Sequence, residues 1–229
     1  MQGELNFDEP AQPLEPPKRA PSSMPKRKRQ FLPMPLLPGM GIGRLDNLFF
    51  AIQPTDAARE AINDLVRKLR RDRNLIGDLL AVRDYHITVH GLGVYEGAPS
   101  LVIEKARAAA EQLRVTPFDV CFDNMMSFVR DDPKKAFVLR AGGPCEPLRV
   151  FHRALGEEMR RTGLRKYVRS SFTPHVTMAY FRETLAQQSI QPICWTVDRF
   201  VLIHSPQRQG VRPDRERHRV VHEWTLGRD

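Results

Sequence analysis

The strongest constraint on the fold is an order of segments that occurs twice along the chain. An apolar run at residues 48–52 is followed by apolar residues at helical spacing and then by the motif His86-Ile87-Thr88-Val89. A second run at residues 137–139 leads in the same way to His175-Val176-Thr177-Met178. From Phe49 to His86 there are 37 residues, and from Phe137 to His175 there are 38. We therefore predict an internal duplication in which each half supplies one motif.

Each motif places a histidine and a threonine on one face of a predicted strand. The β-branched residues favour an extended backbone, and side chains two residues apart in a strand point the same way. His86 therefore lies beside Thr88, and His175 beside Thr177. An imidazole can accept or donate a proton near neutral pH, and a threonine hydroxyl can donate a hydrogen bond to a phosphate oxygen. Two such pairs across a cleft predict acid–base chemistry on a phosphate, with no metal or other cofactor required.

The presence of two His-x-Thr motifs, rather than one, is the main support for this prediction. A His-x-Thr triplet is short enough to arise by chance, and a lone histidine on an apolar strand is usually structural. Two copies in matched strand and helix contexts are expected to form one active site from two related lobes.

With these motifs the chain resembles the two-histidine (2H) phosphoesterases, and within them the bacterial RNA 2′,3′-cyclic phosphodiesterases, also called 2′-5′ RNA ligases. The resemblance extends from about Asp46 to the C-terminus, and it rests on residues 47–52, on the first motif with Gly91-Leu92-Gly93, and on residues 172–179. It implies an α/β (α+β) fold of two pseudo-twofold lobes, in which two mainly antiparallel sheets face a central groove and helices lie outside.

The resemblance also implies a reaction and roles for the four residues. The reaction is hydrolysis of 2′,3′-cyclic phosphate ends of RNA or nucleotides to 2′-phosphomonoesters, with reversible 2′-5′ ligation by the same groups. His86 is then the proton donor, His175 the proton acceptor, and Thr88 and Thr177 bind the phosphate. The residues by themselves allow the two histidines to exchange roles. Two alternatives stay open: a cyclic phosphodiesterase for another small nucleotide or ADP-ribose-type substrate, and a non-catalytic protein that binds RNA ends.

Two positions depart from the family's pattern. Family members often carry an aromatic residue five positions after the first histidine, where this chain has Gly91, and an arginine five positions after the second, where it has Tyr180. Arg182 shares the strand face of Tyr180 by alternation, and is either a substitute for the missing charge or a surface arginine. These departures bear on substrate preference and leave the paired motifs complete.

Proline content and charge distinguish an N-terminal segment from the rest of the chain, and the net charge indicates the kind of partner. Residues 1–44 hold 9 of the 19 prolines and a net charge of +3, which predicts a disordered, basic, proline-rich tail before a two-lobed catalytic domain at residues 45–229. The formal charge of the whole chain is +9, so an anionic partner is expected, RNA or a nucleotide above all. The absence of an apolar run of membrane-spanning length and of a signal-peptide pattern predicts a cytoplasmic protein without a membrane partner, and a monomer is the default.

The three cysteines, Cys121, Cys145 and Cys194, are far apart and odd in number. This spacing predicts neither a disulfide nor a zinc site, but free thiols in a reducing compartment.

Further predictions concern the remaining histidines and strands. Alternation along a strand places His90 on the face of His86 and Thr88, at the border of the groove. His152, His204, His218 and His222 are predicted to be structural or surface groups. Continuous strands are expected at residues 196–204 and 219–226.

Overall fold

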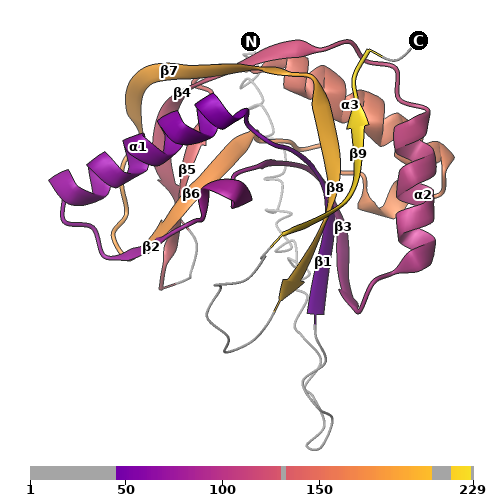
Figure 1. The fold of residues 1–229 in the computed structure, drawn as a ribbon, viewed down its shortest axis with the longest axis horizontal. Coiled ribbons are helices and arrows are strands. Elements are labelled where there is room, and N and C mark those ends of the chain that lie inside the picture. The colour runs from indigo at the N-terminus through magenta and orange to yellow at the C-terminus, as the bar shows by residue number, and fades with distance from the viewer. Residues whose placement is uncertain (1–44, 130–132, 208–217, 228–229) are drawn as a thin grey trace, which may run out of the picture. The chain divides into compact units, whose positions relative to one another are not determined.

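The computed structural model describes residues 45–129, 133–207 and 218–227 (Figure 1). The tail predicted for residues 1–44 lies outside these ranges. Within them the strands are β1 (Leu45–Ile52), β2 (Gly77–Leu79), β3 (Ile87–Glu96), β4 (Phe118–Phe128), β5 (Lys135–Arg140), β6 (His175–Phe181), β7 (Gln188–Val197), β8 (Arg199–Gln207) and β9 (Arg219–Thr225). The helices are α1 (Asp56–Asp72), α2 (Ser100–Glu111) and α3 (Glu146–Arg161), with short 3-10 turns at Val82–Asp84 and Arg165–Tyr167. None of these helices is long and apolar enough to cross a membrane.

The described strands form one antiparallel sheet that consists of two halves. One half has the order β7-β4-β5-β6 and the other β3-β1-β8-β9, while β2 pairs with β6. In the described part of the chain, β3 and β6 connect the halves through one residue pair, Ile87 with Val176. The α+β class, the antiparallel pairing and the two-lobed arrangement are therefore confirmed, with the two predicted sheets continuous at this single point.

Helices α1 and α3 each contact the half of the sheet to which their preceding strand does not belong. α1 follows β1 in the chain but packs against β6 and β7, and α3 follows β5 but contacts β3 as well as β4 (Figure 1). α2 lies beside α3 and contacts β9. The correspondence that an internal duplication predicts is therefore partial, because α3 contacts both halves whereas the main strand contacts of α1 are with the other half.

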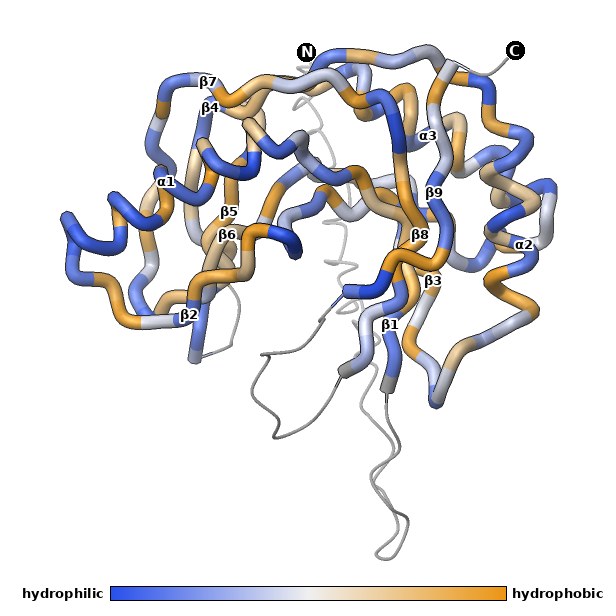
Figure 2. Tube along the Cα trace, in the orientation of Figure 1, coloured by the Kyte–Doolittle hydropathy of each residue, from blue (hydrophilic) through white to orange (hydrophobic). Residues whose placement is uncertain are grey.

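The amphipathic pattern of α1 explains where it begins and which face it buries. Thr55 caps the helix, and its hydroxyl accepts a hydrogen bond from the amide of Ala58 at 3.4 Å. Ile62, Val66 and Leu69 follow at helical spacing and are buried in the main core. In Figure 2 the tube of α1 alternates between hydrophobic and hydrophilic segments, and its C-terminal end is strongly hydrophilic.

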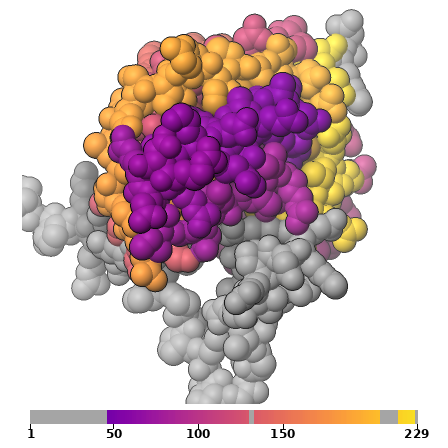
Figure 3. Space-filling view, turned by 60° about the vertical axis from the view of Figure 1, so that its left-hand side comes forward, coloured from indigo at the N-terminus to yellow at the C-terminus, as the bar shows by residue number. Residues whose placement is uncertain are grey.

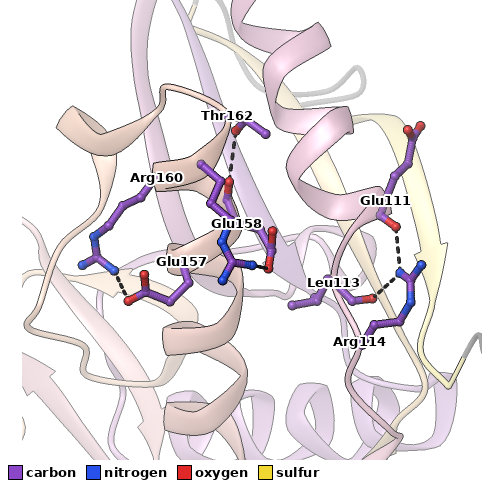
Figure 4. Close-up of polar contacts among 8 residues, drawn as sticks. Glu111, Leu113, Arg114, Glu157, Glu158, Arg160 and Thr162 are labelled. Carbon is purple, nitrogen blue, oxygen red and sulfur yellow. Dashed lines mark hydrogen bonds and ion pairs between the residues drawn. The ribbon is translucent and has the colours of Figure 1, made fainter.

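Ion pairs cover the outer face of α3. Glu157 pairs with Arg160 one turn later, and Glu158 pairs with Arg161 in the same way (Figure 4). After the last turn, the Thr162 hydroxyl donates to the carbonyl oxygen of Glu158 at 3.2 Å. Both arginines are exposed, although the Glu158 side chain is only 14% exposed. Helix-surface pairs of this spacing contribute about 0.3–0.5 kcal/mol each, so most of the stability of α3 comes from its buried face.

The buried residues fall into one large core and a small separate patch. The large core includes Phe50 and Ile52 of β1, whose side chains point to the helix-covered face. Phe49 and Ala51 alternate with them, and with Val201 and Ile203 of β8 they form an apolar patch on the other face of the sheet. One face of β1 therefore packs in the main core, and the other face lies on the side of the sheet that carries the candidate site.

The segment predicted as one strand at residues 196–204 is two strands. β7 ends at Val197 and β8 begins at Arg199, and the two strands belong to opposite halves of the sheet. The prediction of a single strand was wrong because the chain crosses between halves at Asp198 without a glycine or proline to mark the break.

The prediction of three free thiols was also wrong. Cys121 and Cys194 lie opposite each other in the pairing of β4 with β7 and form a disulfide, which leaves Cys145 free. Their sequence separation of 73 residues gave no sign of this, because only the long-range strand pairing brings them together. Disulfides persist in oxidising surroundings, so the bond does not support the inference of a reducing compartment.

Candidate active site

The two motifs meet where the halves of the sheet join. His86 immediately precedes β3, and His175 is the first residue of β6. Ile87 and Val176, the pair that connects the strands, are both fully buried. The side chains on either side of that pair, His86, Thr88, His175 and Thr177, therefore share the opposite face. Because the strands are antiparallel, each histidine lies across from the other motif's threonine.

The two imidazoles are held in the same way. The Nδ1 atom of His86 lies 2.7 Å from the carbonyl oxygen of Asp84, and Nδ1 of His175 lies 2.8 Å from that of Thr173. A carbonyl oxygen only accepts, so Nδ1 donates in both rings and Nε2 is left as the reactive nitrogen. In each motif the acceptor is the carbonyl group of the residue two positions before the histidine. The same local hydrogen bond therefore occurs in both copies of the duplication.

A phenyl ring packs against each histidine. Phe49 of β1 lies 5.0 Å from the His86 ring, and Phe128 of β4 lies 4.8 Å from the His175 ring, measured between centroids. These rings limit the orientations of the imidazoles and lower the local polarity. Burial lowers the pKa of His86 to about 4, and the nearby positive potential of His218 and His175 acts in the same direction. The free protein therefore holds His86 neutral at pH 7.

A β-bulge at the fourth residue of each motif controls which later side chains face the site. Thr88 pairs with Ala51 and His90 with Phe50, so Val89 is an extra residue in β3. Met178 is extra in β6 in the same way, because Thr177 and Ala179 pair with consecutive residues of β5. An extra residue shifts the alternation by one.

The shift brings the fifth residue after each histidine onto the face that carries the motif histidines and threonines. These residues are Gly91 and Tyr180, the two positions at which the sequence departs from the pattern of the proteins it resembles. Among the described residues, apart from its two chain neighbours, no heavy atom lies within 4 Å of where a Cβ on Gly91 would be, so a side chain at this position would meet open space. Tyr180 is half-buried. Arg182, beyond it, is exposed and lines a separate basic pocket.

The same bulge explains why the sequence pattern predicted the wrong strand face for His90, although His90 does border the cavity beside Thr88 and His175. Its ring does not share the face of Thr88 but is 2% exposed, with Nε2 at 2.9 Å from the carbonyl oxygen of His152. The two rings stack at 4.1 Å, and His152 in turn stacks on Phe172 at 4.4 Å. His90 and His152 are structural, as predicted for His152. Burial lowers the pKa of each, to about 4 for His152.

A cavity of about 420 Å³ lies beside His175 and Thr88, at the point where β3 and β6 separate. The stacked rings of His90 and His152 form part of its wall. The rest of the wall comes from Val89, Gly91, Phe128, Phe172 and the polar residues Arg169, Ser171 and Thr173. Aromatic rings, hydroxyls and one guanidinium next to the reactive groups match a planar base joined to a phosphate.

His218 is a site residue that sequence reasoning missed. Its ring lies 4.9 Å from His86 and 5.7 Å from Phe49, and its Nδ1 is 3.8 Å from a carboxylate oxygen of Asp84. The sequence places it 132 residues after His86, outside both motifs. The pairing of β9 with β8 brings it to the site, so no local signal could have identified it.

No group of three or more His, Cys, Asp or Glu side chains in the described ranges is placed to hold a metal ion.

Comparison with known proteins gives a family and a set of related folds. A family model described as the 2′-5′ RNA ligase superfamily matches residues 54–209, more than half of the chain. E. coli LigT in its apo form has a TM-score of 0.59 at 22% identity, covering 80% of this chain and 98% of that one. LigT complexed with 3′-AMP has a TM-score of 0.58 at 22% identity, covering 81% and 99%. For the protein TT0787 of Thermus thermophilus the TM-score is 0.59 at 18% identity, covering 79% and 97%. No curated protein matches the chain.

At these identities the solved structures show a shared fold, and the family model adds a shared sequence pattern that spans both motifs. The chain therefore belongs to the 2′-5′ RNA ligase superfamily, within the two-histidine phosphoesterases.

Proposed function

We propose that the protein hydrolyses 2′,3′-cyclic phosphate ends of RNA or nucleotides to 2′-phosphomonoesters, and that residues 45–229 form the catalytic unit. The observation that carries this proposal is the matched pair of imidazoles, each with Nδ1 bound to a carbonyl oxygen and each beside a threonine on one sheet face. Both motifs lie on one chain, so a monomer is sufficient to build the site.

In the proposed reaction, His175 takes a proton from water, and the water oxygen attacks phosphorus in line with the bond to the ribose 3′ oxygen. That bond breaks, and His86 gives its proton to the departing 3′ oxygen. The products are a 3′-hydroxyl and a 2′-phosphate. Thr88 and Thr177 donate hydrogen bonds to the non-bridging oxygens as their charge increases. With a ribose 5′-hydroxyl in place of water as the attacking group, the same two proton transfers would open the cyclic phosphate to a 2′-5′ phosphodiester and release the 3′ oxygen as a hydroxyl.

The protonation of His86 depends on the substrate. A group with a pKa of about 4 is neutral at pH 7 and cannot donate a proton. A bound cyclic phosphate brings a negative charge next to the ring, and an opposite charge raises the pKa of a histidine. We propose that His86 gains its proton together with the substrate. If the pKa of His86 stays as low in the substrate complex as in the free protein, the roles are exchanged: His86 is the general base and His175 the general acid.

The structures of similar proteins support a nucleotide as the ligand class. E. coli LigT has been solved in complex with 3′-AMP, with phosphate, with ATP and with NADP+. A cavity lined by aromatic and polar groups beside His175 in this chain is consistent with a ligand of that kind.

The decisive experiment offers a cyclic-phosphate-ended oligonucleotide and a 2′,3′-cyclic mononucleotide to the wild type, His86→Ala and His175→Ala, with a chelator present. We expect wild-type turnover to a 2′-phosphate and a loss of about 10²–10⁴-fold in each variant. His222→Ala is the matched control, because this half-buried histidine on β9 is not in either motif. Full activity in either motif variant would refute the two-histidine assignment.

The outcomes also separate the remaining functions. Turnover of cyclic mononucleotides or ADP-ribose-type cyclic phosphates without turnover of RNA would identify a small-molecule phosphodiesterase. Normal RNA binding in both alanine variants, without turnover of any cyclic phosphate by the wild type, would identify a non-catalytic protein that binds RNA ends.

A further inference from the structure

A second, basic cavity lies at the far end of the strand that carries the second motif. Its volume is about 730 Å³, and it lies between the C-terminal part of α1, the segment 74–79 and the end of β6. Five cationic side chains line it: Arg67, Arg70 and Arg71 from α1, with Lys134 and Arg182. In Figure 3 the purple atoms of α1 and the segment after it form an exposed surface beside the orange atoms of β7.

The positive charge of this cavity exceeds the negative charge near it, although Glu183 accepts a hydrogen bond from the amide of Ile76 in its wall and Asp72 lies near Arg71. Asp78 is the acidic residue in its described lining, and it pairs with Lys134. Among the described residues, no carboxylate forms an ion pair with Arg70, Arg71 or Arg182, and all three are exposed. Exposed guanidinium groups gathered in a concavity attract and hold phosphate, because each offers several hydrogen-bond donors together with its charge.

Strand β6 connects this cavity to the candidate active site. Beyond the bulge at Met178, Tyr180 lies on the same face as Thr177. Arg182 is the first residue after β6, where its amide donates to the carbonyl oxygen of Ile76 in the wall of the cavity. The Cα atoms of Thr177 and Arg182 are at most about 18 Å apart, the reach of five extended residues. Tyr180 lies between them and is half-buried. Aromatic rings and cations that alternate along a track are the combination that binds single-stranded nucleic acid.

We propose that the basic cavity is an accessory site for backbone phosphates of an RNA chain whose cyclic 3′ end lies at His86 and His175, with Tyr180 stacking on a base between the two sites. This inference rests on the proposed function and makes it more specific, because it assigns an oligonucleotide, rather than a mononucleotide, as the preferred substrate. The chain leaves the reactive end in its 5′ direction along β6.

The test is the triple variant Arg70→Gln/Arg71→Gln/Arg182→Gln, assayed on a cyclic-phosphate-ended oligonucleotide and on the cyclic mononucleotide with the same terminal base. We expect KM for the oligonucleotide to rise about tenfold or more with kcat retained, and the salt dependence of its kcat/KM to become shallower. Kinetics on the mononucleotide should be unchanged, since it does not reach the cavity. The matched control is Arg107→Gln/Arg149→Gln/Arg153→Gln, which removes the same charge from the exposed surfaces of α2 and α3.

The results distinguish failure of this inference from failure of the proposed function. Equal effects on both substrates, no effect on either, or the same effect in the control variant would overturn the accessory site while leaving the reaction in place. If the wild type turns over neither substrate, binding of a fluorescent oligonucleotide with a 3′-phosphate decides the question. A weaker affinity confined to the cavity variant supports the site, and equal affinities in all three proteins reject it.

Discussion

The imidazole rings of His86 and His218 meet edge to face, with 4.9 Å between their centroids. Asp84 acts on both rings: its carbonyl oxygen accepts from His86, and its buried carboxylate lies 3.8 Å from Nδ1 of His218. The first histidine of the site is therefore positioned by a local carbonyl group and by a third histidine that comes from the other end of the chain.

Burial is the main cause of the low pKa of His86, and the positive potential of His218 lowers it further. We therefore expect His218→Gln to raise the pKa of His86, because it removes this second contribution. The pH midpoint of the His86 ring, followed by NMR, measures this directly. Since His86 also loses a packing partner, kcat/KM should fall by about three- to tenfold. His222→Gln is the control, and an unchanged His86 midpoint would show that His218 has no influence on it.

Replacing either motif threonine with valine should lower kcat by about 10²-fold. Valine has nearly the same shape and the same preference for strands, so the bulge and the fold are retained while the hydroxyl donor is lost. Thr88→Ser and Thr177→Ser keep the donor and should retain most activity. Wild-type kcat in the valine variants would show that the hydroxyls do not contact the phosphate in the transition state.

Stability should depend on pH through the buried histidines. Burial lowers the pKa of His86 and His152 to about 4 and also lowers that of His90, whereas an unfolded histidine titrates near 6.5. Between about pH 4 and 6.5 the unfolded chain binds more protons than the folded one, so the free energy of unfolding rises with pH across this window.

Denaturant midpoints at several pH values between 4.5 and 7.5 test this expectation. His152→Phe should show a shallower dependence, because it removes one titrating group and keeps an aromatic ring against Phe172. A midpoint that stays constant, or that increases on acidification, would contradict the burial of neutral histidines.

Breaking the disulfide should destabilise the protein. The double variant Cys121→Ser/Cys194→Ser should lose about 2–4 kcal/mol of unfolding free energy, because the cross-link restricts the unfolded chain. The control variant Cys145→Ser leaves the bond intact. Thiol titration in denaturant without reductant should find one reactive group in the wild type, and three would show that the bond is absent.

The sequence predicted those features that depend on local patterns. The buried stripe of α1 and the shared face of each histidine and threonine follow from periods of 3.6 and 2. It did not predict features created by long-range pairing. The bulge at Val89 reversed the expected orientation of His90, and strand pairing alone brought Cys121 to Cys194. His218 reaches the site through the pairing of β9, which carries no sequence motif.

The residue pair that connects the two halves of the sheet, Ile87 with Val176, lies directly beneath the reactive side chains. If one half rotates against the other, atoms at this pair move least, and the outer ends of the strands move most. The candidate site is thus located where such a rotation would displace atoms least. The rotation would change the width of the space between the outer strand ends much more than the separation of the two imidazoles.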